Sequence, residues 1–274
     1  MAAMQPAAET RGFGTPAFER VRRLIHEIAG ISLGATKRTM AFNRLMPRVE
    51  ATESADFRRY LDLVEAPGSE ERVHFANALT TNLTSFFREP HHFPVLIEHL
   101  RQAGPGAVVW SAACSTGEEA YSIVMALEEA GIDPRVRVIA SDVDTTALAA
   151  AQDGIYRMDR AGALGEERLR RFFQRGAGNN NGYARVRPEL RARVSFRRIN
   201  LAEPKWNVEG PLAAIFCRNA MIYFGRPLQL EVLQRFHPLI RDGGLLFAGH
   251  SENFHYLAGH FLRALGKTVY EPIG

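Results

Sequence analysis

Apolar residues recur at helical spacing along the first eighty residues. Phe18, Val21, Leu24 and Ile28 lie three or four positions apart and predict an amphipathic helix that stops at Gly30. The same spacing predicts further helices from about residue 36, over 56–65 and over 69–79. No strand-like run precedes residue 105. The pattern therefore predicts a small all-α domain in residues 1–80, of which residues 1–14 are expected to be disordered.

Beyond residue 105 the apolar pattern changes to short β-type runs that alternate with helical stretches. Strands are predicted over 107–112, 135–141, 194–199, 213–217 and 244–248, with a short last strand at 268–270. Helices are predicted over 117–130, 145–152 and 227–240. Strands alternating with helices indicate an α/β fold, so residues 81–274 are expected to form a Rossmann-like domain with a parallel sheet.

One stretch interrupts this alternation. A helical segment at 166–174 is followed by RGAGNNNG, in which glycines bracket three asparagines, a strong loop signal. Residues 183–187 then alternate as a strand exposed on one side would. We therefore expect a small β-type subdomain inserted at about residues 155–193.

Composition and charge narrow the class of protein. The 274 residues carry a net charge of 34 − 30 = +4, and two cysteines exclude a disulfide scaffold and a cysteine-rich zinc site. No apolar run approaches the roughly 18 residues of a membrane helix, and MAAMQPAAET lacks the pattern of a secretory signal. We expect a cytoplasmic protein that does not bind nucleic acid, because no nucleic-acid-binding signature is present.

The turn after the first predicted strand, ACSTGEE at 113–119, opens a helix. It is neither a G-x-G-x-x-G dinucleotide fingerprint nor a G-K-[ST] phosphate loop. Its two acids, Glu118 and Glu119, would repel a pyrophosphate and could accept hydrogen bonds from an ammonium group. The alternative, that both merely complement the helix dipole, is equally consistent with this turn.

A second acid follows the next strand. Asp142 is placed to bind both ribose hydroxyls of a nucleoside, or to cap the following helix, for which Asp144 is the better candidate. Acidic strand ends suit a nucleoside with a cationic amino-acid tail, as in S-adenosylmethionine. They disfavour NAD and ATP, whose phosphates would face carboxylates.

Five segments together match a known family. They are TTNLTSFFRE at 80–89 with PHHF after it, WSAACSTGEEAYS at 110–122, ASDVD at 140–144, FCRNAMIYF at 216–224 and LFAGHSENF at 246–254. In these segments the chain resembles the CheR family of chemotaxis receptor methyltransferases, from about Gly12 to its C-terminus. The resemblance implies a class I methyltransferase domain that transfers a methyl group from S-adenosylmethionine to receptor glutamates, without a metal. The products would be glutamate methyl esters and S-adenosylhomocysteine.

The resemblance also implies site residues. It places cofactor contacts at Asn82, Thr84, Arg88, Glu119, Asp142, Asn200, Leu201, Arg218 and Asn219. Either Glu118 or Glu119 would contact the methionine portion, and we favour Glu119. Ala120 stands where the family has proline, which only preorganises the helix.

Two residues are expected to be catalytic. Arg88 would hold the incoming carboxylate, and Tyr223 would orient the carboxylate or the methyl group. Without the resemblance, a surface ion pair between Arg88 and Glu89 and a core position for Tyr223 would explain them better. A glutamate side chain is already an anion at neutral pH, since its pKa is about 4.3, so the reaction needs no general base.

Other candidate chemistry is better explained by structure. His91 and His92 are adjacent and point apart on a helix, with no third residue spaced to complete a metal site. Cys114 and Cys217 have no identifiable base and are interpreted as packing thiols. The run HSE at 250–252 lacks a G-x-S-x-G elbow, so we expect a loop that lines the substrate side.

The expected partners are the helices of chemoreceptors, through which alone the protein would meet a membrane. A basic face of Lys37, Arg44 and Arg48 would dock on acidic receptor helices or simply be solvated. The inserted subdomain could offer a strand edge to a receptor's C-terminal peptide, as in some family members. The alternative functions are a non-catalytic S-adenosylmethionine-binding adaptor and an ordinary methyltransferase for RNA or small molecules, which would not explain the helical domain.

Overall fold

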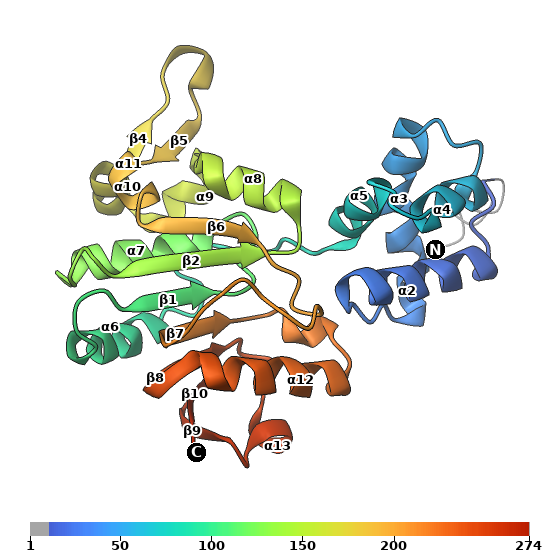
Figure 1. Ribbon diagram of the computed structural model, residues 1–274. Coiled ribbons are helices and arrows are strands. Elements are labelled where there is room, and N and C mark those ends of the chain that lie inside the picture. The colour runs from blue at the N-terminus through green and yellow to red at the C-terminus, as the bar shows by residue number, and fades with distance from the viewer. Residues whose placement is uncertain (1–10, 274) are drawn as a thin grey trace. The chain divides into compact units, whose positions relative to one another are not determined.

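The computed structural model describes residues 11–273, which form two compact units (Figure 1). The first contains the chain up to Thr81 together with Tyr223–Leu228. The second contains Asn82–Ile222 and the residues from Gln229 onward. The disorder expected for residues 1–10 concerns residues outside the described part of the chain.

The first unit consists of helices, as its periodicity predicts. They are α2 (Thr15–Ala29), the 3-10 turn η1 (Ala35–Lys37), α3 (Arg38–Ala51), α4 (Phe57–Glu65) and α5 (Glu71–Leu79). Helix α2 ends at Gly30, whose φ of 71° lets its N–H bond to the His26 carbonyl. Helix α4 starts at Asp56, whose side chain accepts from the Arg59 N–H.

The disorder expected up to residue 14 does not extend to Phe13. Its side chain is completely buried. Its ring centroid lies 4.4 Å from that of Phe57, 5.6 Å from that of Phe42 and 6.2 Å from that of Phe18. An aromatic side chain removed from water in this way anchors the residues before α2 to the helical core.

The basic face expected on α3 is engaged inside the unit. Arg48 binds the buried Glu71 carboxylate with two hydrogen bonds of 2.9 and 2.6 Å, and the Tyr60 hydroxyl donates to the same carboxylate. Arg44 donates to the carbonyls of Leu79 and Thr80 at the end of α5. Neither guanidinium is freely solvated, so the solvated alternative does not describe these two residues, and docking on receptor helices stays a prediction. Helix α3 also continues through Pro47 to its end.

In the described part of the second unit, seven strands form one sheet in the order β6-β2-β1-β7-β8-β10-β9. Figure 1 shows them stacked from β6 down to β9. Their bounds are β1 (Val108–Ser111), β2 (Arg137–Asp142), β6 (Val194–Arg198), β7 (Leu212–Cys217), β8 (Ile240–Ala248), β9 (Leu262–Gly266) and β10 (Val269–Pro272). The strands from β6 to β8 are parallel, and β10 and β9 pair antiparallel. The predicted parallel sheet is confirmed.

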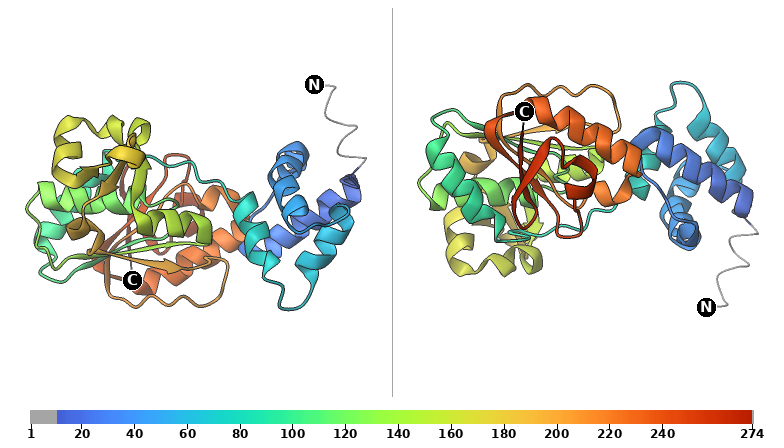
Figure 2. Two further views of the ribbon diagram at one scale, coloured as in Figure 1. Left: turned by 90° about the horizontal axis from the view of Figure 1, so that it is seen from above. Right: turned by 90° about the horizontal axis from the view of Figure 1, so that it is seen from below.

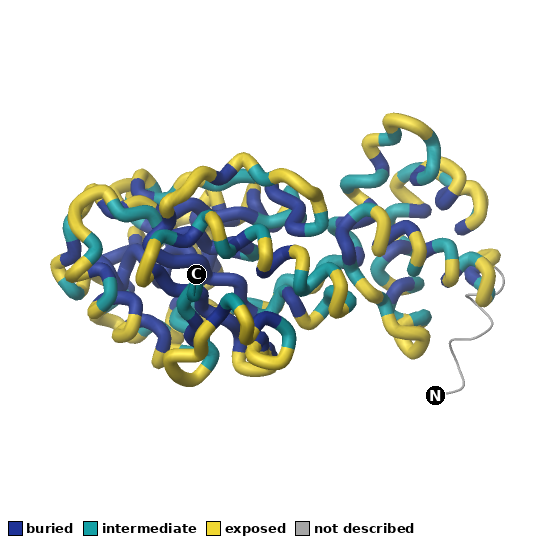
Figure 3. Tube along the Cα trace, turned by 60° about the horizontal axis from the view of Figure 1, so that its bottom comes forward, coloured by how far each residue is buried: buried dark blue, intermediate teal, exposed yellow. Residues whose placement is uncertain are grey.

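Helices cover both faces of this sheet. Helices α6 (His92–Gln102) and α7 (Glu118–Glu129) share one apolar core with Val109, Phe216 and Phe247. On the other face, the Trp110 ring lies edge-on to Phe236 of α12 (Arg226–Phe236). Figure 2, seen from below, shows α6 and α12 on opposite sides, and Figure 3 shows buried segments of the chain in the interior of this unit. Helix α8 (Thr145–Asp153) follows β2, and the short η4 (Met221–Tyr223), η5 (His237–Leu239) and α13 (His255–Ala258) lie in connections.

The predicted insertion is a small antiparallel sheet. Its strands β3 (Ile155–Arg157), β4 (Phe173–Arg175) and β5 (Tyr183–Val186) pair in the order β3-β5-β4. Its helices are α9 (Met158–Ala161), η2 (Gly162–Leu164), α10 (Glu166–Phe172), η3 (Gly178–Asn180) and α11 (Pro188–Arg191). Strand β5 alternates exposed and buried residues as expected, but it lies in the centre, so β3 and β4 form the edges. The hairpin of β4 and β5 projects from the unit (Figure 1).

Candidate functional site

The order of the parallel strands reverses between β1 and β7. From β1 the chain continues to β2 on one side and later returns to β7 on the other. In open α/β sheets ligands bind beyond the carboxyl ends of the strands at this switch point. The segments 82–89, 112–119, 142–144, 218–222 and 249–252 contact one another there.

Strained backbone is concentrated in these segments. Ser115, Asn219, Phe87 and Glu89 have φ values of 50°, 59°, 50° and 54°. Non-glycine residues rarely adopt this left-handed conformation, and it persists where the surroundings enforce it, often at functional sites. Gly117, with a φ of 92°, completes the turn after β1.

Asp142 stands at the carboxyl end of β2, where the sequence predicts it. One carboxylate oxygen accepts from the Ser115 N–H at 2.8 Å and the other from the Asp144 N–H at 3.0 Å. Burial raises the pKa of Asp142 to about 6, although these N–H groups act in the opposite direction. The carboxylate forms no ion pair with a described cation, so it keeps accepting capacity for a ligand.

Asn82 joins the turn after β1 to the start of α8. Its side-chain oxygen accepts from the Ser115 hydroxyl at 3.0 Å, and its amide donates to Asp144 at 2.7 Å. The other Asp144 oxygen accepts from the N–H groups of Thr146 and Ala147. Asp144 is therefore the helix cap, as predicted, and Asn82 connects it to Ser115, whose N–H binds Asp142.

Glu119 forms a buried ion pair with Arg218. Arg218 Nε donates to one Glu119 oxygen at 2.6 Å, and the Ser111 hydroxyl donates to the other at 2.6 Å. The pair joins the end of β7 to the first turn of α7, with side-chain exposures of 2% and 9%. Two residues that the resemblance assigned to the cofactor thus contact each other directly.

Arg218 also binds the segment before α6. Its Nη1 donates to the Arg88 carbonyl at 2.6 Å and to His92 Nδ1 at 3.2 Å, and it lies 3.8 Å from Glu89. Burial, with the nearby Arg218 charge, lowers the pKa of His92 to about 3, so the ring is neutral and accepts this hydrogen bond. One guanidinium thereby connects three parts of the site.

Glu118 faces a different neighbourhood from Glu119. Its carboxylate accepts from the Thr116 hydroxyl at 2.6 Å and from Arg160 of the insertion at 3.2 Å. Burial raises the pKa of Glu118. The two adjacent acids therefore diverge: Glu119 turns toward β7 and Glu118 toward the inserted sheet.

The Arg88 side chain donates to the Leu83 carbonyl at 2.9 Å. Among residues 11–273 no acid forms an ion pair with it, so the alternative pair with Glu89 is wrong. Glu89 instead accepts from the His250 backbone N–H and contacts its ring. Thr84 lies in the same segment and is partly exposed.

Asn200 and Leu201 follow β6 and are both buried. The Ile199 N–H donates to the Asp142 carbonyl at 3.1 Å, which brings this turn beside the end of β2. The Asn200 side chain accepts from the Ala202 N–H at 3.0 Å. The turn after β6 therefore adjoins the loop that carries Asp142.

A further acid that the sequence analysis did not identify organises the loop after β7. The buried Glu252 carboxylate accepts from the backbone N–H groups of Asn219, Met221 and Gly249, at 2.9, 2.8 and 2.6 Å. A Cβ on Gly249 would lie 2.3 Å from the Asn219 side chain, so only glycine fits. The sequence analysis singled out residues 250–252 as a loop, but it could not predict that Glu252 binds these backbone N–H groups.

We expect Glu252→Gln to lower the free energy of unfolding of the second unit by about 1–3 kcal/mol. The amide nitrogen of Gln would face a backbone N–H and leave that buried donor without an acceptor. Urea unfolding followed by tryptophan fluorescence measures this, because both tryptophans, Trp110 and Trp206, lie in the second unit. Glu203→Gln, at an exposed acid, is the control. Equal midpoints for the two variants would contradict the role of Glu252.

Tyr223 belongs to the first unit, where its carbonyl accepts from the Ser32 N–H at 2.7 Å. Its side chain is partly buried. Its catalytic role stays a prediction.

The remaining candidates belong to the packing. Cys114 and Cys217 are buried free thiols, and burial raises the pKa of both, as expected for packing residues. His92 packs its ring against Phe247 at 5.2 Å. Within the described part of the chain no three His, Cys, Asp or Glu side chains are grouped as metal ligands would be. No helix of residues 11–273 has both the length and the apolar character needed to cross a membrane.

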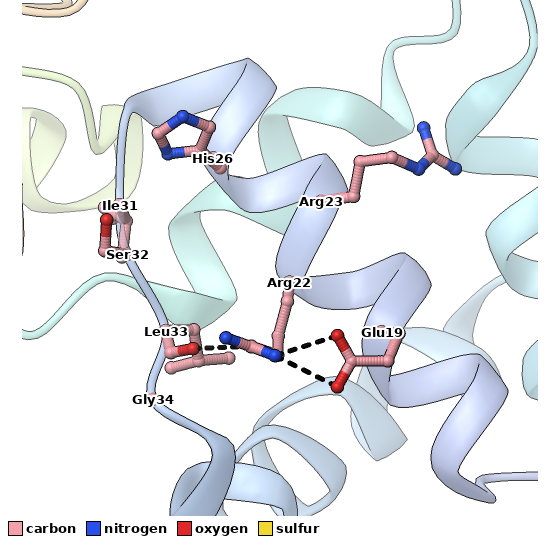
Figure 4. A pocket seen from close by; sticks show the side chains of 8 residues that line it. All are labelled: Glu19, Arg22, Arg23, His26, Ile31, Ser32, Leu33 and Gly34. Carbon is pink, nitrogen blue, oxygen red and sulfur yellow. Dashed lines mark hydrogen bonds and ion pairs between the residues drawn. The ribbon is translucent and has the colours of Figure 1, made fainter. Parts of the chain in front are cut away.

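The helical unit contains a surface pocket of about 440 Å³ between α2 and residues 31–34 (Figure 4). Its two arginines form ion pairs with neighbouring acids. Arg22 binds both oxygens of Glu19 and donates to the Leu33 carbonyl, and Arg23 pairs with Glu27 and Glu65. Both arginines that line this pocket are therefore already paired with acids of the same unit.

Comparison with known proteins covers both units. The family described as "CheR methyltransferase, all-alpha domain" matches residues 16–80, and "CheR methyltransferase, SAM binding domain" matches residues 82–269.

Relatives match along most of the chain. A "Chemotaxis protein methyltransferase" of Salmonella typhimurium is 52% identical over 257 residues, which cover 92% of this chain and 88% of the relative. The protein of the same name from Escherichia coli is 49% identical, covering 92% and 89%. "Chemotaxis protein methyltransferase 2" of Pseudomonas aeruginosa is 46% identical, covering 93% and 92%. The chain thus belongs to the CheR methyltransferase family, with that family's all-α domain followed by its S-adenosylmethionine-binding domain.

Proposed function

We propose that this protein transfers a methyl group from S-adenosylmethionine to glutamate side chains of chemoreceptors. The observation that carries the proposal is the Asp142 carboxylate at the switch point, which pairs with no described cation, beside a turn after β1 that carries two acids and is not a phosphate-binding loop. The names of the relatives, which are chemotaxis protein methyltransferases, support the same activity.

The residues present fit this donor. Asp142 binds backbone N–H groups and no described cation, so its carboxylate retains lone pairs for two ribose hydroxyls. One glutamate of the adjacent pair, which we propose to be Glu119 rather than Glu118, would supply negative charge for the ammonium group of the methionine portion. Further donor contacts are proposed for Asn82, Thr84, Arg88, Asn200, Leu201, Arg218 and Asn219.

The proposed reaction requires mainly that the methyl group and the glutamate oxygen are held in line. S-adenosylmethionine supplies an electrophilic methyl group on a sulfonium sulfur. A glutamate oxygen of the receptor forms the new bond to this methyl group while the carbon–sulfur bond breaks, and no proton has to be removed. Good alignment of such partners accounts for about 7–11 kcal/mol of a barrier. Tyr223 would orient the carboxylate.

Arg88 is proposed to hold the incoming carboxylate. Its guanidinium donates to one backbone carbonyl and pairs with no described acid, so donors remain for a substrate. We expect Arg88→Ala to reduce turnover about a hundredfold, the size of effect expected when a reacting group is misplaced, and to change donor affinity much less. Arg101→Ala, at an exposed arginine of α6, is the control. Normal turnover in Arg88→Ala would refute the assignment.

Incubation with labelled methyl donor and receptor-bearing membranes tests the proposed function. Base-labile methyl esters on the receptor are expected. Donor binding without any transfer would support the non-catalytic adaptor instead, and transfer only to RNA or small molecules would refute the glutamate substrate. The proposed location is the cytoplasm, where receptor helices are accessible.

A further inference from the structure

The inserted sheet contacts the turn after β1 directly. The Tyr156 hydroxyl, on β3, donates to the Thr116 carbonyl at 2.7 Å. Tyr156 is only 4% exposed, so the side chain that makes this hydrogen bond is itself buried. The backbone that leads into α7 is therefore held by a side chain of the insertion.

The backbone at Gly117 packs tightly against Tyr156. A Cβ at Gly117 would lie 3.1 Å from the Tyr156 hydroxyl and 2.8 Å from the Cβ of Ala151. The left-handed turn thus closes directly against the tyrosine and against α8. A shift of Tyr156 requires the turn to move with it.

A second contact reaches the first turn of α7. Arg160, on α9 of the insertion, donates to Glu118 at 3.2 Å. Glu118 is 1% exposed and Arg160 is 49% exposed. The buried acid thus depends on a surface cation of the insertion for its charge partner, and removing that cation leaves a buried carboxylate without an opposite charge.

The segment 82–89 also packs on the insertion. The Phe86 ring lies edge-on to Tyr156 at 4.9 Å and to Phe173 of β4 at 5.7 Å. The Arg168 guanidinium of α10 stacks 3.8 Å from the Phe87 ring centre. The insertion therefore supports two of the segments that meet at the candidate donor site.

We propose that the inserted sheet is a positioning element of the donor site: Tyr156 and Arg160 hold residues 116–118 in the conformation that binds S-adenosylmethionine. This inference rests on the proposed function. Because such an effect is reciprocal, donor binding also stabilises β3, and a partner that binds the donor-bound conformation of the insertion more tightly raises donor affinity.

The test compares binding of S-adenosylhomocysteine to the full chain and its variants by calorimetry. Tyr156→Phe removes only the hydroxyl, and Arg160→Gln removes the charge and shortens the side chain. Each is expected to weaken binding about five- to thirtyfold, the range of a lost buried hydrogen bond. Tyr183→Phe, on β5 of the same insertion and 43% exposed, is the matched control and should bind normally. Arg160→Lys should restore most of the affinity.

A purely structural role would give a different pattern. Positioning predicts weaker binding while the thermal midpoint of the unliganded variants stays within a few degrees of Tyr183→Phe. Weaker binding that merely follows a large fall of this midpoint, or affinity within twofold of the unchanged protein in both variants, would overturn the inference.

Hydrogen exchange on the unchanged protein gives a second measurement that needs no variant. S-adenosylhomocysteine should slow amide exchange in Ile155–Arg157, and unchanged exchange throughout the insertion would overturn the inference. If the unchanged protein fails to bind S-adenosylhomocysteine at all, the proposed function falls and this inference falls with it. Normal binding with unaffected variants would refute the inference alone.

Discussion

Asp142→Ala is expected to lower the affinity for S-adenosylhomocysteine at least about a hundredfold, since two hydrogen bonds from ribose hydroxyls to a charged acceptor each contribute about 1.5–3 kcal/mol. The variant also removes the acceptor of the Ser115 N–H, which helps to fix the turn after β1. Calorimetry at pH 7.5 measures the loss. Asp159→Ala, at an exposed acid paired with Arg157, is the control. Undiminished affinity in Asp142→Ala would refute the ribose assignment.

The pH dependence of binding follows from the same carboxylate. Burial raises the pKa of Asp142 to about 6, and only the ionised form accepts from both hydroxyls. The affinity should therefore be constant above about pH 7 and fall as pH decreases through 6, by up to tenfold per unit. In Asp142→Ala the residual affinity should lose this slope. An unchanged slope would assign the titration to another group, such as Glu118.

The raised pKa of Asp142 affects the stability of the fold with a pH dependence opposite to its effect on donor binding. The pKa of Asp142 rises from 3.8, its ordinary value, to about 6 in the folded chain. The folded state then binds its proton more tightly than the unfolded state between these values. The contribution of Asp142 to the free energy of unfolding is present below about pH 4 and is lost as pH rises through 6. The site thus holds a carboxylate where folding alone would prefer a neutral group.

The spacing of apolar residues predicted those helices and strands in which buried residues recur at regular intervals. Helix α2 and strands β1, β2 and β7 each present apolar residues at the spacing of their secondary structure, so their positions were confirmed within a few residues. Strand β9 was missed because only Leu262 along it is buried, which leaves no apolar alternation to read. The strand pairs with β10 through its backbone, and a backbone contact has no sequence signal.

Site residues that directly follow a strand could be located from the sequence. Contacts between residues far apart in the sequence could not. Asp142 and the capping role of Asp144 follow from position along the chain. The ion pair of Arg218 with Glu119 joins residues 99 positions apart, and sequence spacing carries no information about it. For the same reason the sequence did not predict that the Arg44 guanidinium, on α3, donates to a backbone carbonyl at the end of α5.

Arg218→Met is expected to lower the free energy of unfolding of the second unit by about 3–5 kcal/mol, because it leaves the Glu119 carboxylate buried without its cation. The guanidinium is 2% exposed and also holds the Arg88 carbonyl. Tryptophan fluorescence during urea unfolding measures the change. Arg135→Met breaks the exposed pair with Asp133, and because surface pairs contribute little, it should leave the urea midpoint unchanged.

A double-mutant cycle separates the ion pair from general packing. If the charge left on Glu119 causes the loss, then adding Glu119→Gln to Arg218→Met should recover a substantial part of it, because no buried charge remains. Glu119→Gln alone should be milder than Arg218→Met, since the guanidinium keeps the Arg88 carbonyl and the nearby Glu89. If instead the two losses simply add, the stability of this joint comes from side-chain packing, and the ion pair serves the site rather than the fold.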